Sequence, residues 1–98
     1  MARLIWTNQA LNDFDALLEY IALNAPVAAR RFGEQLIAKV ELLQSAPLLG
    51  SFIAEDESLT YREILQGNYR LIYRVSEDVV YLMTIHHAAR LLDPRKIS

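Results

Sequence analysis

YREILQGNYRLIYRVSEDVVYLMTIHHAAR, residues 61–90, is the stretch that decides the fold of this chain. Two short polar pairs, Gly67-Asn68 and Glu77-Asp78, divide it into three runs rich in Val, Ile, Leu and Tyr. Gly and Asn reach the positive φ values that a two-residue hairpin requires, Gly without steric cost. The stretch therefore predicts three consecutive antiparallel strands.

The faces of these strands follow from their pairing, because side chains alternate along a strand and directly paired residues share a face. If both turns are two-residue loops, Leu65 pairs with Arg70, and Arg70 pairs with Ile85. The face suited to packing helices then holds Ile64, Leu71, Tyr73, Val75, Val80 and Leu82, together with Arg62, Tyr69, Thr84 and His86. The other face is expected to be exposed, and its polar side chains are Glu63, Arg70, Arg74 and His87.

The first half of the chain predicts one strand and a hairpin of two helices. The run RLIWT, residues 3–7, has β character, and Thr7 or Asn8 can cap the helix that follows. Pro26 suits the first turn of a second helix, which should end before Pro47. The apolar positions at helical spacing are Leu11, Phe14, Leu17, Leu18 and Ile21 in the first helix, and Phe32, Leu36, Val40 and Leu43 in the second.

Residues 48–59 form the connection between the helices and the three strands. They include Gly50 and the acidic triplet Glu55-Asp56-Glu57, and we interpret them as a solvated connector, with a partner-binding loop as the alternative. Beyond Arg90 the tail has little periodicity, and Pro94 argues against a long helix. The chain is thus predicted to be a single α+β domain, residues 1–98, in the order β-α-α-β-β-β, with the helix hairpin on one face of a small, mainly antiparallel sheet.

Composition limits the classes of protein to consider. The 98 residues include no cysteine, no signal peptide is visible, and no apolar run approaches the length that spans a bilayer, so we expect a cytoplasmic protein without membrane contact. The net charge is −2. Residues 1–60 carry four Lys and Arg against eight Asp and Glu, and residues 61–98 carry six against four. Proteins that hold nucleic acid by phosphate contacts are usually basic, so the charge favours a protein partner over sequence-specific nucleic-acid binding.

Three motifs carry a family resemblance: Tyr61-Arg62-Glu63-Ile64, then YRLIYRV at residues 69–75, and IHHAAR at residues 85–90. With the element order, they resemble the RelE/ParE superfamily of toxins from bacterial type II toxin–antitoxin modules, over nearly the whole chain. The remaining matching positions are Trp6, Asp13, Tyr20-Ile21-Ala22, Pro26, Ala28-Ala29, Phe32, Pro47 and Gly50.

The resemblance implies two activities, depending on the branch. Members similar to RelE cut messenger RNA on the ribosome, a reaction that needs cations beside the phosphate and groups that move protons. In that branch Arg70 would stabilise the phosphate, His87 would donate a proton, and Arg90 would add a basic group, with Arg62 as a further candidate.

Departures from that pattern favour the ParE branch, whose members poison DNA gyrase without being nucleases. The first strand of the three lacks the lysines of the ribosomal members, the C-terminal end lacks their tyrosine, and the charge is acidic. We therefore expect a gyrase inhibitor that is not an enzyme, needs no cofactor or metal, and is neutralised in a hetero-oligomer with a cognate antitoxin. An inactive homologue retained as an antitoxin-binding partner is the third hypothesis. The expected partner-binding residues are Glu63, Arg70, Arg74, His87, Arg90, Arg95 and Lys96, with His87 to Lys96 as the contact region for gyrase.

Each singled-out residue also has a structural interpretation. Arg70 binds either a phosphate or carboxylate of a partner, or Glu63 of its own sheet, and it can exchange one carboxylate for another. His87 is more commonly a structural histidine at a strand end than a proton donor, and His86 is expected to be packed. Adjacent strand residues point to opposite faces, so the two histidines should not share a metal ion.

Overall fold

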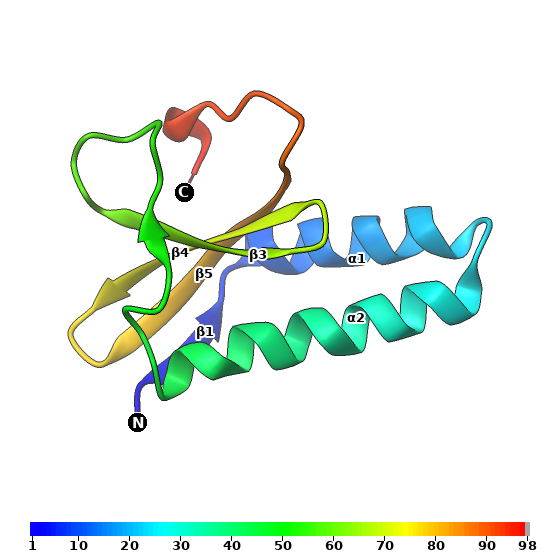
Figure 1. Cartoon of the computed structure of the whole chain (residues 1–98), viewed down its shortest axis with the longest axis horizontal. Helices are drawn as coiled ribbons and strands as arrows, with labels where there is room; N and C mark the ends of the chain where they lie inside the picture. The colour runs from blue at the N-terminus through cyan, green and yellow to red at the C-terminus, as the bar shows by residue number, and fades with distance from the viewer. Residues whose placement is uncertain (98) are drawn as a thin grey trace.

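The computed structural model of the chain describes residues 1–97 and contains one five-stranded sheet with a helix hairpin packed against it (Figure 1). The strand order is β1-β5-β4-β3-β2, with β1 parallel to β5 and the other pairs antiparallel. The elements are β1 (Arg3–Trp6), α1 (Asn8–Ala22), α2 (Pro26–Glu41), the 3-10 turn η1 (Leu42–Gln44), β2 (Ser51–Phe52), β3 (Tyr61–Gln66), β4 (Tyr69–Ser76), β5 (Val79–His87) and the 3-10 turn η2 (Pro94–Lys96). The predicted α+β architecture is confirmed.

The helix hairpin forms as the sequence predicts. Thr7 caps α1, since its hydroxyl accepts a hydrogen bond from the Ala10 N–H at 3.2 Å, and Pro26 stands in the first turn of α2. The hairpin projects beyond the sheet at the end where α1 turns into α2 (Figure 1). Within residues 1–97, neither helix combines the length and the apolar character needed to cross a membrane. The main core between hairpin and sheet includes Leu17, Leu36, Val40, Leu43, Ile64, Leu71, Tyr73, Val80, Leu82 and Ile85.

Both hairpin turns have the predicted length of two residues. Gly67 and Glu77, the first residues of these turns, have φ of 58° and 56°. A positive φ at the first position is part of the turn geometry that suits the twist of paired strands. The register between β3 and β4 is also as predicted, with Leu65 opposite Arg70.

The register between β4 and β5 differs from the prediction. Ile72 pairs with Thr84 whereas Tyr73 pairs with Leu82, so Met83 is an extra residue in β5 and Arg70 lies opposite His86 rather than Ile85. Such a bulge transfers every later side chain of its strand to the other face. The predicted faces of the last four residues of β5 were therefore wrong: Ile85 and His87 lie on the helix side, and Thr84 and His86 pair with residues of the opposite face.

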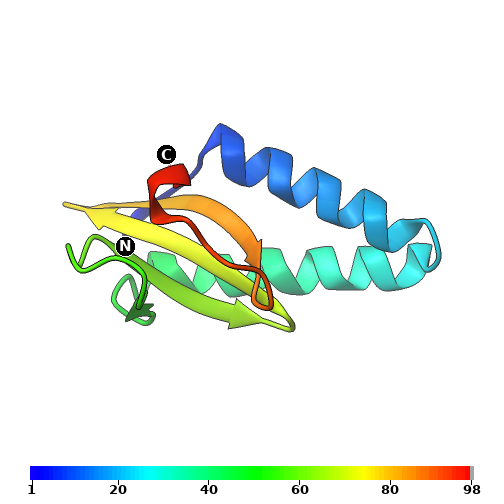
Figure 2. The ribbon, with the colours of Figure 1, turned by 90° about the horizontal axis from the view of Figure 1, so that it is seen from above.

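The opposite face of the sheet is not the open surface that was expected. Ile72 and Met83 on this face are 0% and 4% exposed, and they pack with Ile53 and Ile97 in a second, smaller core. Figure 2 shows the C-terminal segment passing across the strands. The alternation of side chains along the strands predicts which residues share a face. It does not predict that the C-terminal tail covers one of these faces.

The connection before β3 is more ordered than a solvated connector. It contains the short edge strand β2, which pairs Ser51 with Glu63 and Phe52 with Arg62. Ile53 follows directly and is 3% exposed. A two-residue strand is too short to leave a period-2 pattern, which explains why the sequence did not predict it.

Candidate functional site

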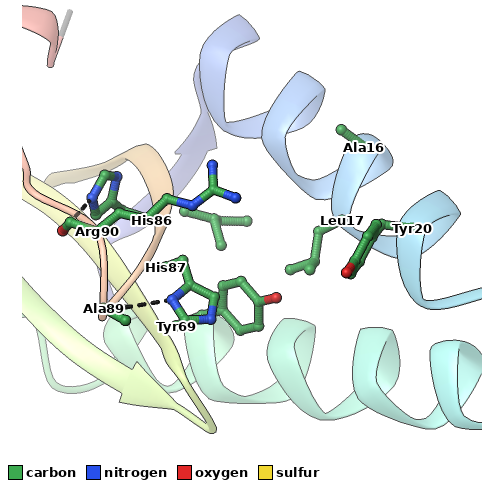
Figure 3. A pocket seen from close by; sticks show the side chains of 9 residues that line it. Ala16, Leu17, Tyr20, Tyr69, His86, His87, Ala89 and Arg90 are labelled. Carbon is green, nitrogen blue, oxygen red and sulfur yellow. Dashed lines mark hydrogen bonds between the residues drawn. The ribbon is translucent and has the colours of Figure 1, made fainter.

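A cleft of about 640 Å³ lies between α1 and the C-terminal end of β5. Figure 3 shows Leu17 and Tyr20 on the α1 side, facing His87 and Arg90 on the β5 side. Among the described residues that line it, Arg90 is the one with a permanent charge. The cleft is lined by Ala16, Leu17, Tyr20, Tyr69, Ile85, His86, His87, Ala89 and Arg90.

His87 is packed into the wall of this cleft by an aromatic row. Its ring stands edge-on to Tyr69 with 5.1 Å between centroids, and Tyr69 stands edge-on to Phe32 of α2 at 5.5 Å. The Ala89 N–H donates to His87 Nδ1 at 3.1 Å, so a neutral His87 ring carries its proton on Nε2. His87 is thus a positioned histidine whose packing depends on the helices, and the bulge in β5 brings it there.

The turn after β5 places Arg90 at the mouth of the cleft. The Arg90 N–H donates to the His87 carbonyl at 3.1 Å, and the Arg90 carbonyl lies 3.1 Å from His86 Nε2. These contacts hold the backbone of the turn and leave the Arg90 side chain exposed. The cleft therefore combines an apolar floor, two imidazoles and one guanidinium, an arrangement that suits an amphipathic segment with a carboxylate.

A second polar cluster surrounds Arg70 on the opposite face of the sheet. Arg70 is only 9% exposed, and its Nε donates to Glu63 Oε1 at 2.5 Å. Its Nη1 and Nη2 donate to the two carboxylate oxygens of Glu55 at 2.7 and 2.8 Å. The hydrogen bonds with Glu55 raise the pKa of the Arg70 guanidinium, and the same bonds lower the pKa of the Glu55 carboxyl. The guanidinium is bound along two edges by its own chain.

Two other predicted arginines are occupied in structural contacts. Arg62 donates from Nη1 to the Gly50 carbonyl at 2.7 Å, and its guanidinium lies 4.0 Å from the Phe52 ring centroid. Arg74 lies over the Tyr81 ring at 4.2 Å, near the other end of β4. Four residues along a strand separate Arg74 from Arg70 by about 13 Å, so the two guanidinia do not form one cationic site.

The cations of the tail lie in and beside η2. Arg95 is bridged to Asp93 at 2.9 Å, with its side chain 89% exposed. Lys96 lines a smaller pocket of about 310 Å³ between the tail, β5 and the start of α1. Both side chains are exposed, and Lys96 shares its pocket with His86, the residue that lies opposite Arg70.

The structure thus divides the predicted site residues among separate places. Glu63 and Arg70 form the pair that was expected, and His87 and Arg90 share the cleft. The prediction that His87 faces the same side as Arg70 was wrong, because of the bulge at Met83.

Two features of these sites were missed in the sequence. Glu55 was predicted to be a solvated residue of the acidic triplet, whereas it pairs with Arg70. Its negative charge was the one signal in the sequence that favoured a cationic partner. Leu17 and Tyr20 were assigned to the helix and to the family resemblance, without a place in the site. An aromatic residue that is 72% exposed on α1 is a signal of a binding surface, but its exposure cannot be read from helical spacing alone.

Comparison with known proteins identifies the family. The profile of the ParE toxin of the type II toxin–antitoxin system parDE matches residues 4–92. Toxin RelE2 of Caulobacter vibrioides is 34% identical over 92 residues, which cover 93% of this chain and all of that protein. A solved structure of the chromosomal ParDE system from P. aeruginosa has the same fold, with a TM-score of 0.76 at 21% identity, over 89% of this chain and 96% of that one. The chain therefore belongs to the ParE toxin family of type II toxin–antitoxin systems, within the RelE/ParE superfamily.

Proposed function

We propose that this ParE-family toxin inhibits DNA gyrase through surface contacts and is neutralised by a cognate antitoxin. The observation that carries the choice of gyrase over the ribosome is the state of Arg70. A ribonuclease of the RelE type needs that guanidinium beside the scissile phosphate, whereas here Glu55 and Glu63 bind it and it is 9% exposed.

The distribution of the other candidate groups supports the same choice. His87 lies on the helix side of the sheet and Arg70 on the opposite side, so one phosphate does not reach both. Arg62 is held by the Gly50 carbonyl and the Phe52 ring. Cleavage needs cations and a proton donor converging within hydrogen-bond distance of one phosphate, and these side chains do not converge.

The surface around the C-terminal turn is the proposed contact region for gyrase. Leu91 is 100% exposed and follows the exposed Arg90, and the exposed Arg95 and Lys96 lie further along the same tail. An exposed apolar side chain beside several cations is typical of a protein–protein contact patch rather than of a core. These exposed residues lie within the region His87 to Lys96, and their exposure supports its assignment as the contact region.

The cleft beside α1 is the proposed docking site for the antitoxin. The ParDE system from P. aeruginosa is named as a toxin–antitoxin system, which supports a partner of this kind here. An antitoxin segment that folds on binding would place apolar side chains against Leu17 and Tyr20 and a carboxylate toward Arg90.

One pair of assays tests the target. The purified toxin, free of antitoxin, is added to a gyrase supercoiling reaction and to a translating ribosome system. Loss of supercoiling with intact messenger RNA is the expected result. Cleavage of messenger RNA at ribosomal A sites would overturn the proposal and favour the ribonuclease, for which the shared position of His87 and Arg90 is the supporting observation. A folded toxin that leaves both reactions unchanged would favour the inactive homologue.

A further inference from the structure

The two carboxylates on Arg70 are held in different ways. Glu63 belongs to the body of β3, where it pairs with Ile72 on one side and Ser51 on the other, and it binds Arg70 Nε. Glu55 belongs to the loop between β2 and β3 and binds the Nη1–Nη2 edge with both oxygens. The backbone of Glu63 is fixed by pairing on both sides, whereas that of Glu55 lies in a loop, so Glu55 is the easier of the two to displace from Arg70.

The loop that carries Glu55 has few anchors. Ile53 is buried at its start, and the hydrogen bonds of Asp56 and Ser58 stay within the loop. Leu59 adopts a φ of 56°, a left-handed conformation that is unfavourable for a branched side chain. The contact of Glu55 with Arg70 is therefore a main tether of this loop on the sheet, and segments with few buried contacts are the first to open.

We propose that the Nη1–Nη2 edge of Arg70 is a carboxylate-binding site that Glu55 closes, and that an acidic side chain of a protein partner replaces Glu55 there. The planar guanidinium binds any carboxylate in the same bidentate geometry, so the exchange keeps both hydrogen bonds. The site lies on the opposite face of the sheet from the cleft, and its occupation depends neither on gyrase nor on the docking site proposed for the antitoxin.

Charge favours a carboxylate over a phosphate as the ligand. When Glu55 leaves, Glu63 remains on Nε at 2.5 Å and neutralises most of the Arg70 charge. A carboxylate restores the local charge that Glu55 had supplied. A phosphate dianion adds a further negative charge beside Glu63, and like charges at this distance repel.

The test uses the variant Glu55→Ala, which clears the edge, with Glu57→Ala as the matched control from the same acidic triplet. The Arg70 Nε–Hε resonance is followed by NMR during titration with three probes. These are a short peptide of alternating Glu and Ala, its Gln counterpart and inorganic phosphate. The acidic peptide should bind Glu55→Ala about tenfold more tightly than the wild type. In the wild type the peptide must first displace the Glu55 carboxylate from its two hydrogen bonds with Arg70. The Gln peptide should leave the resonance unchanged.

Four results would overturn the proposal. The acidic peptide fails to shift the resonance in Glu55→Ala, or it binds wild type and variant equally. Glu57→Ala behaves like Glu55→Ala, which would indicate a general charge effect of the loop. Phosphate binds Glu55→Ala more tightly than the acidic peptide, which would assign the edge to a phosphate ligand. If Glu55→Ala loses its fold, Glu55→Gln keeps the size of the side chain and is held to the same outcomes. Gyrase plays no part in these titrations, so the first three results leave the proposed target untouched. A preference for phosphate would also weaken the choice of gyrase, because that choice rests on an Arg70 that its own carboxylates occupy.

Discussion

Asp13 of α1 accepts hydrogen bonds from two consecutive residues of β5, at the point where that strand departs from regular pairing. Its Oδ2 lies 2.5 Å from the Thr84 hydroxyl and 3.2 Å from the Ile85 N–H. Both residues directly follow Met83, the extra residue of the bulge. The bulge brings His87 to the helix side, where it lines the cleft. Asp13 therefore stabilises the bulge on which the shape of the cleft depends.

Removing this carboxylate should cost stability. In Asp13→Ala the Thr84 hydroxyl and the Ile85 N–H lose their partner, so we expect the free energy of unfolding to fall by about 1–3 kcal/mol. Urea unfolding measures the loss, and the NMR contacts between His87 and Tyr69 should weaken with it. Asp15→Ala, an exposed position on the same helix, is the control. Equal losses in the two variants would contradict the role given to Asp13.

The Tyr73 hydroxyl joins β4 to the connection before β2. Ionisation of this hydroxyl should therefore destabilise the fold at alkaline pH. Its hydroxyl donates to the Pro47 carbonyl at 2.9 Å and accepts from the Gly50 N–H at 2.8 Å, and burial raises the pKa of Tyr73 above its ordinary value of 10.0. A raised folded-state pKa gives stability that is complete below about pH 10 and is lost as the pH rises toward the folded value.

The free energy of unfolding of the wild type should therefore fall as the pH rises above about 10, and Tyr73→Phe should lack this component. At neutral pH the variant should already be less stable by about 1–3 kcal/mol, since the Gly50 N–H is left unpaired. Unfolding in denaturant across this pH range measures both effects. Tyr20→Phe, on an exposed tyrosine, should keep the wild-type profile.

Much of the fold could be predicted because it rests on local signals. The cap at Thr7, the break at Pro26 and the turn at Gly67 each act within a few residues, and the apolar spacing of the helices needs no tertiary information. The same local register placed Glu63 within reach of Arg70 and Arg74, and the ion pair with Arg70 was one of the two alternatives for that arginine.

Apart from the short strand β2, the features that the sequence did not predict depend on contacts between different elements of the chain. The bulge at Met83 is supported by Asp13, some 70 positions away, and no pattern within β5 predicts it. Ile97 covers Ile72 only after the tail returns across the sheet. The ion pair between Glu55 and Arg70 likewise joins a loop to a strand. Loop residues follow no periodic pattern, so the sequence around Glu55 predicts only a solvated carboxylate and does not indicate its partner.

The bond between Glu55 and Arg70 should make stability depend on pH in the acid range. Arg70 lowers the pKa of Glu55 from its ordinary value of 4.5, so the stabilisation is present above about pH 4.5 and is lost as the pH falls through the folded-state value. Wild type should exceed Glu55→Gln by about 1 kcal/mol at neutral pH, and the two should converge in acid. Unfolding free energies of both proteins from neutral to acid pH provide the measurement. A constant difference at all pH values would exclude the ion pair as its cause, and Glu57→Gln should follow the wild type.

The cleft beside α1 makes a prediction about the antitoxin, which is taken as the small protein encoded next to the toxin. Tyr20→Ala should weaken antitoxin binding by roughly 5- to 30-fold, because a large aromatic side chain at an interface commonly contributes about 1–2 kcal/mol. Val27→Ala is the matched control, since Val27 is equally exposed at 72% and does not line the cleft.

Arg90 should act mainly on the rate of association, because its charge stands at the mouth of the cleft rather than on its floor. A charge at the rim of an interface steers the encounter and is screened by salt, so Arg90→Gln should slow association at low ionic strength and lose that difference at high salt. Tyr20→Ala should instead speed dissociation at both ionic strengths. Surface plasmon resonance with immobilised antitoxin separates the two rates. If Arg90→Gln and Tyr20→Ala leave both rates unchanged while Val27→Ala alters them, the antitoxin docks on the projecting end of the hairpin and not in the cleft.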